Sequence, residues 1–168
     1  YSVEPIMPNK LMKFKKKFIS EIKRGHQFIT FREWLAFYSL EAEIQSKVTI
    51  LQIDIEANEY EVILNMDEAI IKNLDVIVIE LHRLRFINHV LGQQLIFTLL
   101  AKLSKFHQAI HCNVNTTSQI SKISQNVVIP DVVELTYIRK NYLIDGKLHE
   151  ANVQNVKSCR APQSWYST

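Results

Sequence analysis

The chain has 168 residues, a formal net charge of +3 and only three glycines. A globular sequence of this length usually carries about a dozen glycines. Loops that cradle nucleotide phosphates need two or three clustered glycines, because the backbone must turn tightly and approach the phosphate closely. Gly25, Gly92 and Gly146 are far apart, so the sequence excludes such a loop within these residues.

The remaining composition is typical of one globular domain. Apolar residues make up 47% of the chain, which is enough to build a core. No apolar run approaches the roughly 18 residues of a membrane span, and no signal peptide opens the chain, so we expect no membrane partner. Cys112 and Cys159 lack C-x-x-C spacing, which favours a reduced, cytoplasmic setting with both thiols structural. The small positive charge does not indicate a nucleic-acid partner. Tyr1 replaces the usual Met and suggests a fragment or a processed chain.

The first third of the sequence contains several weak element signals. Residues 1–3 are β-prone. Apolar residues at every third or fourth position predict a helix over 10–24, ended by Gly25, with a lysine-rich face that we interpret as solvated. Residues 27–31 predict a short strand, and 32–45 predict a helix.

The pattern becomes clearer after residue 47, where apolar runs alternate with amphipathic stretches. Strands are expected at 48–55, 76–81, 106–113 and 132–139, and helices at 58–73 and 90–103. The continuous β-branched run at 48–55 is typical of a strand buried on both faces of a parallel sheet. This alternation predicts an α/β domain over 1–146 with helices on both faces of a parallel sheet, followed by a tail at 147–168.

Polar side chains gather where the predicted strands end, which is where open α/β sheets bind ligands. The first strand ends in two acids with a third just beyond, the second ends in an acid and a histidine, and the third ends in a histidine and two amides. These residues are Asp54, Glu56, Glu59, Glu80, His82, His111, Asn113 and Asn115. Such groups are costly to bury together unless they bind a ligand or each other. His82 can equally be a capping or core histidine, and Glu59 is better explained as a first-turn helix acid than as a catalytic group.

Several of these segments carry a family resemblance. LQIDIEANEY at 51–60 resembles the L-K-I-D-[IV]-E-G-x-E motif of the FkbM family of S-adenosylmethionine-dependent methyltransferases. Three further family elements have counterparts in the same order, namely IVIELH at 77–82, HCNVN at 111–115 and PDVVELTYIR at 130–139. YSVEP at 1–5 is similar to an earlier strand end of these enzymes.

The resemblance implies a Rossmann-like class I methyltransferase sheet, mostly parallel with an antiparallel last strand and helices on both faces. The first strand and the glycine-rich loop of that fold would precede Tyr1. The implied activity is O-methylation of a small hydroxylated acceptor, such as a sugar or glycan, with S-adenosylmethionine as cofactor. Two departures from the motif, Ala57 for Gly and Gln52 for Lys, favour the alternative of a degenerate, non-catalytic binding or assembly domain.

The resemblance also implies roles for the strand-end residues. Asp54, His82 and His111 would be catalytic, with a histidine as general base and Glu80 orienting it. Glu4, Asp54 and Glu56 would bind the cofactor, with Glu4 on its ribose hydroxyls. The residues expected to contact substrate or support the site are Glu59, Glu80, Asn113 and Asn115. Asp54, Glu80 and Asn113 offer oxygens for a cation, but the motif requires no metal and none is predicted.

Overall fold

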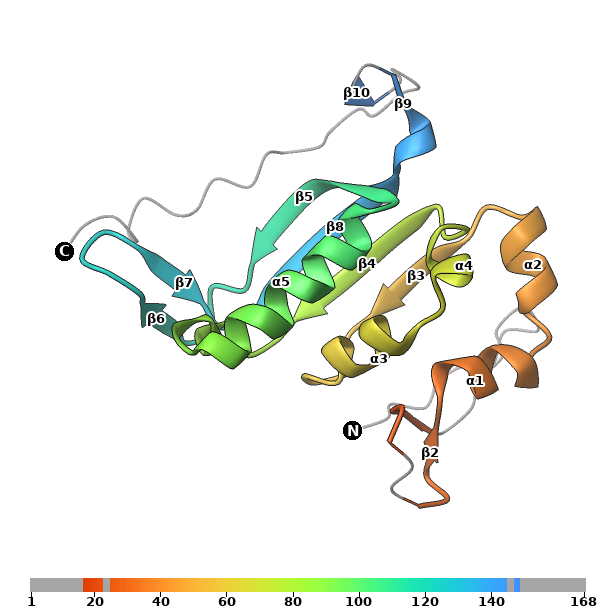
Figure 1. Cartoon of the computed structure of the whole chain (residues 1–168), viewed down its shortest axis with the longest axis horizontal. Coiled ribbons are helices and arrows are strands. Elements are labelled where there is room, and N and C mark those ends of the chain that lie inside the picture. Colours follow the sequence, from red (N-terminus) through yellow and green to blue (C-terminus); the bar gives the residue numbers. More distant parts are fainter. Residues whose placement is uncertain (1–16, 23–24, 145–146, 149–168) are drawn as a thin grey trace.

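A four-stranded sheet forms the centre of the molecule (Figure 1). The computed structural model describes residues 17–22, 25–144 and 147–148. The strand order is β3-β4-β8-β5, with β3 at Ile50–Ile53, β4 at Val76–Leu81, β8 at Val133–Arg139 and β5 at His107–Val114. Strand β3 pairs with β4 in parallel, whereas β8 is antiparallel to both of its neighbours. The sheet is therefore mixed.

The predicted Rossmann-like, mostly parallel sheet is wrong. The expected antiparallel last strand is present as β8, but in the four-stranded sheet one pair is parallel and two are antiparallel, and the described strands have no clear Rossmann arrangement. The reason lies between β5 and β8, where the polar segment folds into the hairpin of β6 (Ile120–Lys122) and β7 (Val128–Pro130). A parallel pair needs a long crossover, usually a helix. Without one, the chain returns antiparallel, and β8 inserts between β4 and β5.

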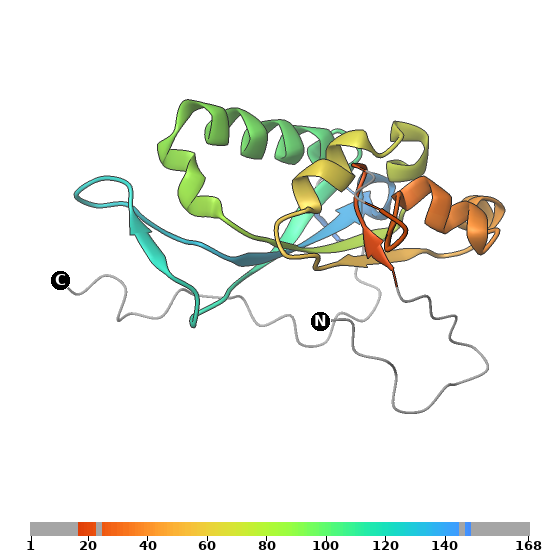
Figure 2. The same ribbon diagram turned by 90° about the horizontal axis from the view of Figure 1, so that it is seen from below.

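Helices cover one face of this sheet. α3 (Glu59–Asn65), α4 (Glu68–Ile71) and α5 (Val90–Ser104) lie on the same side, and the described residues place no helix over the other (Figure 2). The expectation of helices on both faces is therefore wrong for the described part of the chain. The core lies between these layers and consists of buried apolar side chains of the helices and of strands β3, β4 and β8. Its fully buried members include Val62, Ile63, Ile71, Ile77, Ile79, Leu99 and Leu103.

Strand β3 lies at an edge of the sheet, so the prediction of a strand buried on both faces is also wrong. Ile53 is buried on the helix side, but Ile50 on the opposite face is 64% exposed. The β-branched composition of 48–55 therefore reflects strand propensity rather than double burial.

Two predicted helices are each divided into two. The segment 58–73 breaks at Met66 and Asp67, which have extended backbone between α3 and α4. Lys102 on α5 donates to the carbonyl oxygens of Leu64 and Met66, each at 2.6 Å, and thus satisfies the end of α3. The segment 32–45 breaks around Ser39, whose φ is 54°. It forms α1 (Phe31–Phe37), which starts with a capping box at Thr30, and α2 (Glu41–Ser46).

The remaining elements are short. β1 (Phe18–Ile19) and β2 (Phe28–Ile29) form a parallel pair, which confirms the strand expected near 27–31 and contradicts the helix predicted over 10–24 where the structure describes it. Two 3-10 turns, η1 and η2, span Leu84–Asn88 and Lys140–Tyr142, and β9 (Leu143–Ile144) pairs with β10 (Lys147–Leu148).

Several further expectations fall on residues that the structure does not describe. The strand at 1–3, Cys159 and nearly all of the predicted tail at 147–168 lie outside the described residues. Cys112 is exposed on β5 and so does not belong to the buried core. None of the described helices has the length and apolarity that a membrane crossing requires.

Candidate functional site

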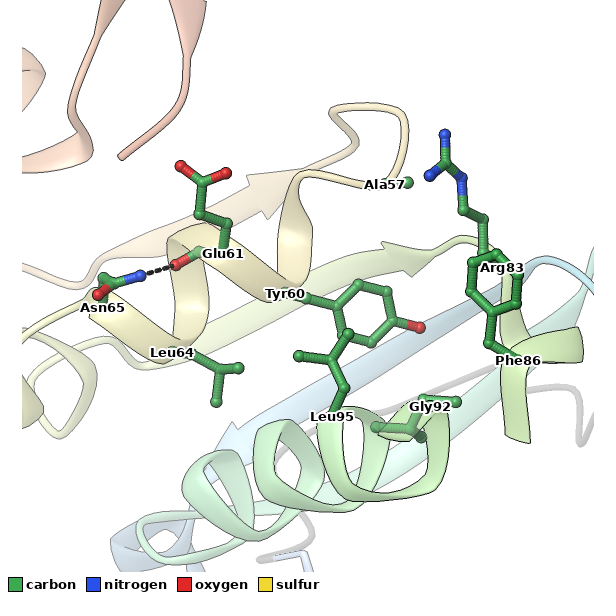
Figure 3. Close-up of a pocket in the computed structure, with 10 residues that line it drawn as sticks. Ala57, Tyr60, Glu61, Leu64, Asn65, Arg83, Phe86, Gly92 and Leu95 are labelled. Carbon is green, nitrogen blue, oxygen red and sulfur yellow. Dashed lines mark hydrogen bonds between the residues drawn. The ribbon is translucent and has the colours of Figure 1, made fainter. Parts of the chain in front are cut away.

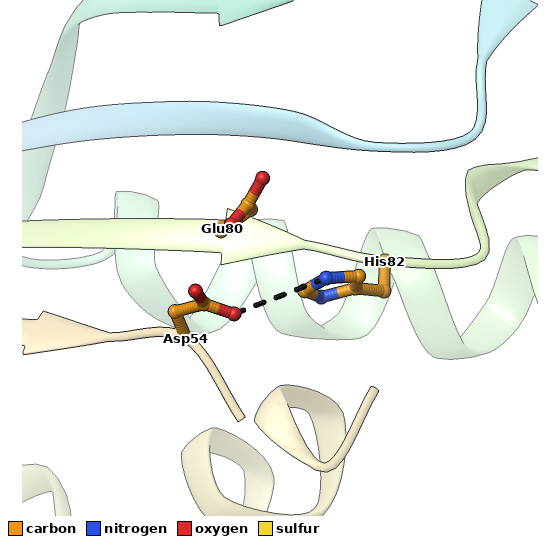
Figure 4. Close-up of side chains that lie close together, drawn as sticks. All are labelled: Asp54, Glu80 and His82. Carbon is orange, nitrogen blue, oxygen red and sulfur yellow. Dashed lines mark ion pairs between the residues drawn. The ribbon is translucent and has the colours of Figure 1, made fainter. Parts of the chain in front are cut away.

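The carboxyl ends of β3 and β4 bring three predicted site residues together (Figure 4). Asp54 directly follows β3, Glu80 is the penultimate residue of β4, and His82 directly follows β4. One side-chain atom from each lies within 4.8 Å of the other two. Because β3 and β4 run in parallel, their ends meet at one edge of the sheet. We call Asp54, Glu80 and His82 the strand-end cluster.

The imidazole of His82 lies at the centre of the local contacts. Its Nε2 atom is 3.9 Å from Asp54 Oδ1 and 3.6 Å from Glu56 Oε2. Its Nδ1 atom is 3.1 Å from Glu59 Oε1. The ring is 15% exposed. It lies between the buried Glu59 carboxylate on one side and the more exposed carboxylates of Asp54 and Glu56 on the other.

Glu59 fixes the position of both His82 and the loop before α3. Its side chain is fully buried, and Oε1 accepts hydrogen bonds from the backbone N–H groups of Ile55 at 2.9 Å and Ala57 at 3.3 Å. An ionised carboxylate only accepts hydrogen bonds. If Glu59 is ionised, the His82 Nδ1–H group donates to its Oε1 atom; Nε2 is the ring atom that faces Asp54 and Glu56.

The loop itself adopts an unusual backbone conformation. Glu56 and Ala57 both have left-handed geometry, with φ values of 55° and 78°. This geometry costs an L-residue with a Cβ roughly 1–2 kcal/mol. Ala57 occupies the position at which the FkbM motif has Gly, the residue that adopts this conformation without strain. The tight turn places the Glu56 carboxylate beside His82.

A polar pocket borders the strand-end cluster on the side of β8 and β5. Its volume is about 330 Å³, and its lining includes Glu80, Asn113, Asn115 and Glu134. Asn115 Nδ2 donates to Glu80 Oε1 at 3.4 Å. Glu134 is the cross-strand partner of Glu80, and sequence reasoning missed it. The available signal was an acid within the otherwise apolar start of the 132–139 strand.

Among the predicted site residues that the structure describes, His111 belongs neither to the strand-end cluster nor to the lining of the polar pocket. His111 pairs with Thr136 of β8, and β8 separates it from β4, so its expected position beside the other strand ends is not observed. The prediction missed this separation because it placed the third strand directly beside the second. Glu4, expected on the cofactor ribose, lies outside the described residues.

A second, mainly apolar pocket lies between α3, η1 and α5, with a volume of about 280 Å³ (Figure 3). Tyr60, Phe86 and Leu95 contribute to its wall, and Arg83 brings a guanidinium to it. The Tyr60 hydroxyl donates to the carbonyl oxygen of His82 at 2.9 Å, and burial raises the pKa of this phenol. Tyr60 follows Glu59 and Arg83 follows His82, so this pocket adjoins the cluster. Sequence reasoning singled out neither residue, since a Tyr in a helix and an Arg after a strand are common.

The charges around His82 are unbalanced. Asp54, Glu56, Glu59 and Glu80 lie around it, and within the described ranges no lysine or arginine forms an ion pair with any of them. This arrangement suits a cationic ligand.

Comparison with known proteins finds no match among protein-family models, curated proteins or solved structures. The similarity to FkbM methyltransferases therefore stays a prediction.

Proposed function

We propose that this chain contributes to an S-adenosylmethionine-dependent O-methyltransferase that acts on a small hydroxylated acceptor. The observation that carries the proposal is the strand-end cluster, where Asp54 faces His82 and the buried Glu59 orients the imidazole. The motif LQIDIEANEY, which contains Asp54, Glu56 and Glu59, supports it independently.

The donor set of the cluster fits the proposed cofactor. S-adenosylmethionine carries a sulfonium and an ammonium cation together with ribose hydroxyls, and carboxylates attract or accept hydrogen bonds from all of these. Asp54 and Glu56 are the exposed carboxylates beside His82 and would hold these groups. The bound cofactor supplies an activated methyl group, so the protein must align the acceptor and remove its proton.

His82 is placed to take that proton. Its Nδ1 is engaged by Glu59, so a neutral ring offers the Nε2 lone pair to an acceptor hydroxyl. Glu59 then stabilises the imidazolium that forms, since its carboxylate lies 3.1 Å from Nδ1. The pocket lined by Tyr60 and Arg83 adjoins this position, and its volume of about 280 Å³ suits a small acceptor.

Calorimetric titration of the chain with S-adenosylmethionine tests the proposal. We expect saturable binding that Asp54→Asn weakens at least tenfold, because one carboxylate is lost while the side-chain shape is kept. Asp67→Asn is the matched control, since Asp67 pairs with Arg32 on the surface away from the cluster. Absence of binding by a chain shown to be folded would contradict the proposal.

Transfer of a labelled methyl group to a panel of hydroxylated acceptors tests the chemistry. We expect His82→Gln to lower turnover by about 10²–10⁴-fold, as for loss of a general base, with little change in cofactor affinity. Equal turnover by the variant and the parent chain would remove His82 from the reaction.

A non-catalytic binding or assembly domain is the second candidate. It is favoured by Ala57 at a φ of 78° and by the position of β3, which is an edge strand among the described residues. Exposed edge strands pair readily with another strand. Concentration-dependent self-association measured by sedimentation, without cofactor binding, would favour this candidate over the enzyme.

A further inference from the structure

We infer that the strand-end cluster binds a divalent transition-metal ion. Asp54, Glu80 and His82 would supply the ligands, with Glu56 as a fourth and Glu59 as the positioning residue. The sequence predicted no metal, and the geometry of the side chains is what points to one. The inference does not rest on the proposed function, because a cation can bind here without any cofactor.

The negative charge of the buried Glu59 carboxylate is only partly compensated among the described residues. Glu59 is fully buried, and its Oε2 atom has no hydrogen-bond partner among the described residues. The other oxygen of the same carboxylate faces His82. A buried carboxylate is costly without a compensating charge nearby. Among the described residues, His82 is the group that forms an ion pair with Glu59, and it also faces Asp54 and Glu56, so one proton would have to balance several carboxylates.

The second argument is the spacing of the donor atoms. His82 Nε2 lies 3.9 Å from Asp54 Oδ1 and 3.6 Å from Glu56 Oε2. These separations exceed the roughly 2.7–3.2 Å of an N–H···O hydrogen bond. Ligands bound at about 2.1 Å to one metal lie roughly 3.0–3.4 Å apart, depending on its coordination geometry. The observed atoms thus need only a small inward movement, which the half-exposed Asp54 and exposed Glu56 side chains allow.

The third argument is the support of the histidine. Metal-binding histidines usually donate their second N–H to a carboxylate or carbonyl, which fixes the ring and leaves the other nitrogen for the metal. Glu59 accepts from His82 Nδ1 at 3.1 Å and is itself held by two backbone N–H groups. The ring orientation required for coordination through Nε2 is therefore already present.

The donor set also selects the kind of ion. One imidazole nitrogen with two or three carboxylate oxygens suits Mn²⁺, Zn²⁺ or Fe²⁺, whereas Mg²⁺ and Ca²⁺ prefer oxygen alone. In the proposed methyl transfer, such an ion would lower the pKa of an acceptor hydroxyl that it contacts. The ion and the acceptor proton would both use the Nε2 lone pair, so His82 would be the base in the metal-free site and a ligand in the metal-bound one.

Titration with Mn²⁺, followed by loss of the free-ion signal in electron paramagnetic resonance, tests the inference on the 168-residue chain. Mn²⁺ is the probe because its low thiolate affinity avoids binding at cysteines. We expect one saturable site, with Mg²⁺ in tenfold excess failing to displace Mn²⁺. We expect affinity to fall at least 100-fold in His82→Ala and at least tenfold in Asp54→Asn. The control His89→Ala removes an exposed histidine before α5 and should bind like the parent chain.

Glu59→Gln tests the positioning role, and a 10–100-fold loss of Mn²⁺ affinity with native circular dichroism is expected. Asp54 is half-exposed, so Asp54→Asn stays informative if a buried variant fails to fold. Paramagnetic broadening of amide signals should centre on residues 54–59 and 80–83. No saturable binding by the folded parent chain, unchanged affinity in both Asp54→Asn and His82→Ala, or broadening centred elsewhere would each overturn the inference. Because cofactor binding is measured separately, failure here leaves the proposed function testable.

Discussion

Replacing Ala57 with glycine should stabilise the protein. Ala57 has a φ of 78°, within the left-handed region. A residue with a Cβ pays about 1–2 kcal/mol to adopt this conformation, and glycine does not. Glycine loses more backbone freedom on folding, which offsets about 0.5–1 kcal/mol of this gain. We therefore expect Ala57→Gly to raise the free energy of unfolding by about 0.5–1 kcal/mol.

A second Ala→Gly change supplies the matched control. Ala101 is exposed in the interior of α5, where the backbone is helical and glycine costs about 1 kcal/mol relative to alanine. The same chemical substitution should thus have opposite signs at Ala57 and Ala101. Side-chain burial cannot produce this reversal, because each change removes one methyl group.

Urea denaturation followed by circular dichroism measures both effects as shifts of the midpoint at constant slope. In thermal unfolding, a gain of 1 kcal/mol corresponds to an increase in Tm of about 2–4 °C for a chain of this size. A loss of stability in Ala57→Gly similar to that in Ala101→Gly would refute the reasoning. It would show that the Ala57 methyl contributes more by packing at the pocket wall than it costs in backbone strain.

Two further predictions concern the opposite end of the sheet and the core. Asp75→Ala should lower the free energy of unfolding by about 3–5 kcal/mol in urea denaturation. The buried carboxylate accepts from Arg139, Tyr142 and the Thr49 N–H, and its removal leaves Arg139 without this partner. A loss below about 1 kcal/mol would contradict this prediction. Burial lowers the pKa of His107 from its usual 6.5, so the unfolded chain takes up the proton first. The contribution of His107 to the free energy of unfolding should therefore be complete above about pH 6.5 and fall at lower pH, by up to about 1.4 kcal/mol per pH unit. His107→Gln should reduce this slope when unfolding is measured at a series of pH values.

Local patterns predicted individual elements well. Strand β4 has the predicted bounds of 76–81, and α5 and β5 begin or end within one residue of the prediction. Each of these segments has a strong apolar period of its own. The antiparallel direction of β8 was expected, but its place between β4 and β5 was not, because that place depends on the connection after β5, where a polar segment without a clear period forms the β6–β7 hairpin. The breaks within the two divided helices were also missed, because no Pro or Gly in the sequence marks them.

The candidate site was likewise predicted where it depends on neighbouring strands and missed where it depends on the later connection. The contacts among Asp54, Glu80 and His82 could be predicted because β3 and β4 are consecutive parallel strands, so their ends coincide whatever lies beyond them. His111 could not be placed, since its distance from β4 depends on the inserted β8. Glu134 entered the neighbouring pocket through that same insertion.

The two ends of β4 differ in how acidic groups are compensated. At the amino end, Asp75 is buried but paired with Arg139, with 2.6 Å between Asp75 Oδ1 and Arg139 Nη2. At the carboxyl end, Glu80 lies opposite Glu134, and like charges in cross-strand register destabilise a sheet. Asn115 donates to Glu80, but among the described residues no lysine or arginine forms an ion pair with Glu80, in contrast to Asp75 at the amino end. The negative charge that remains around His82 is the charge that the metal ion we propose would balance.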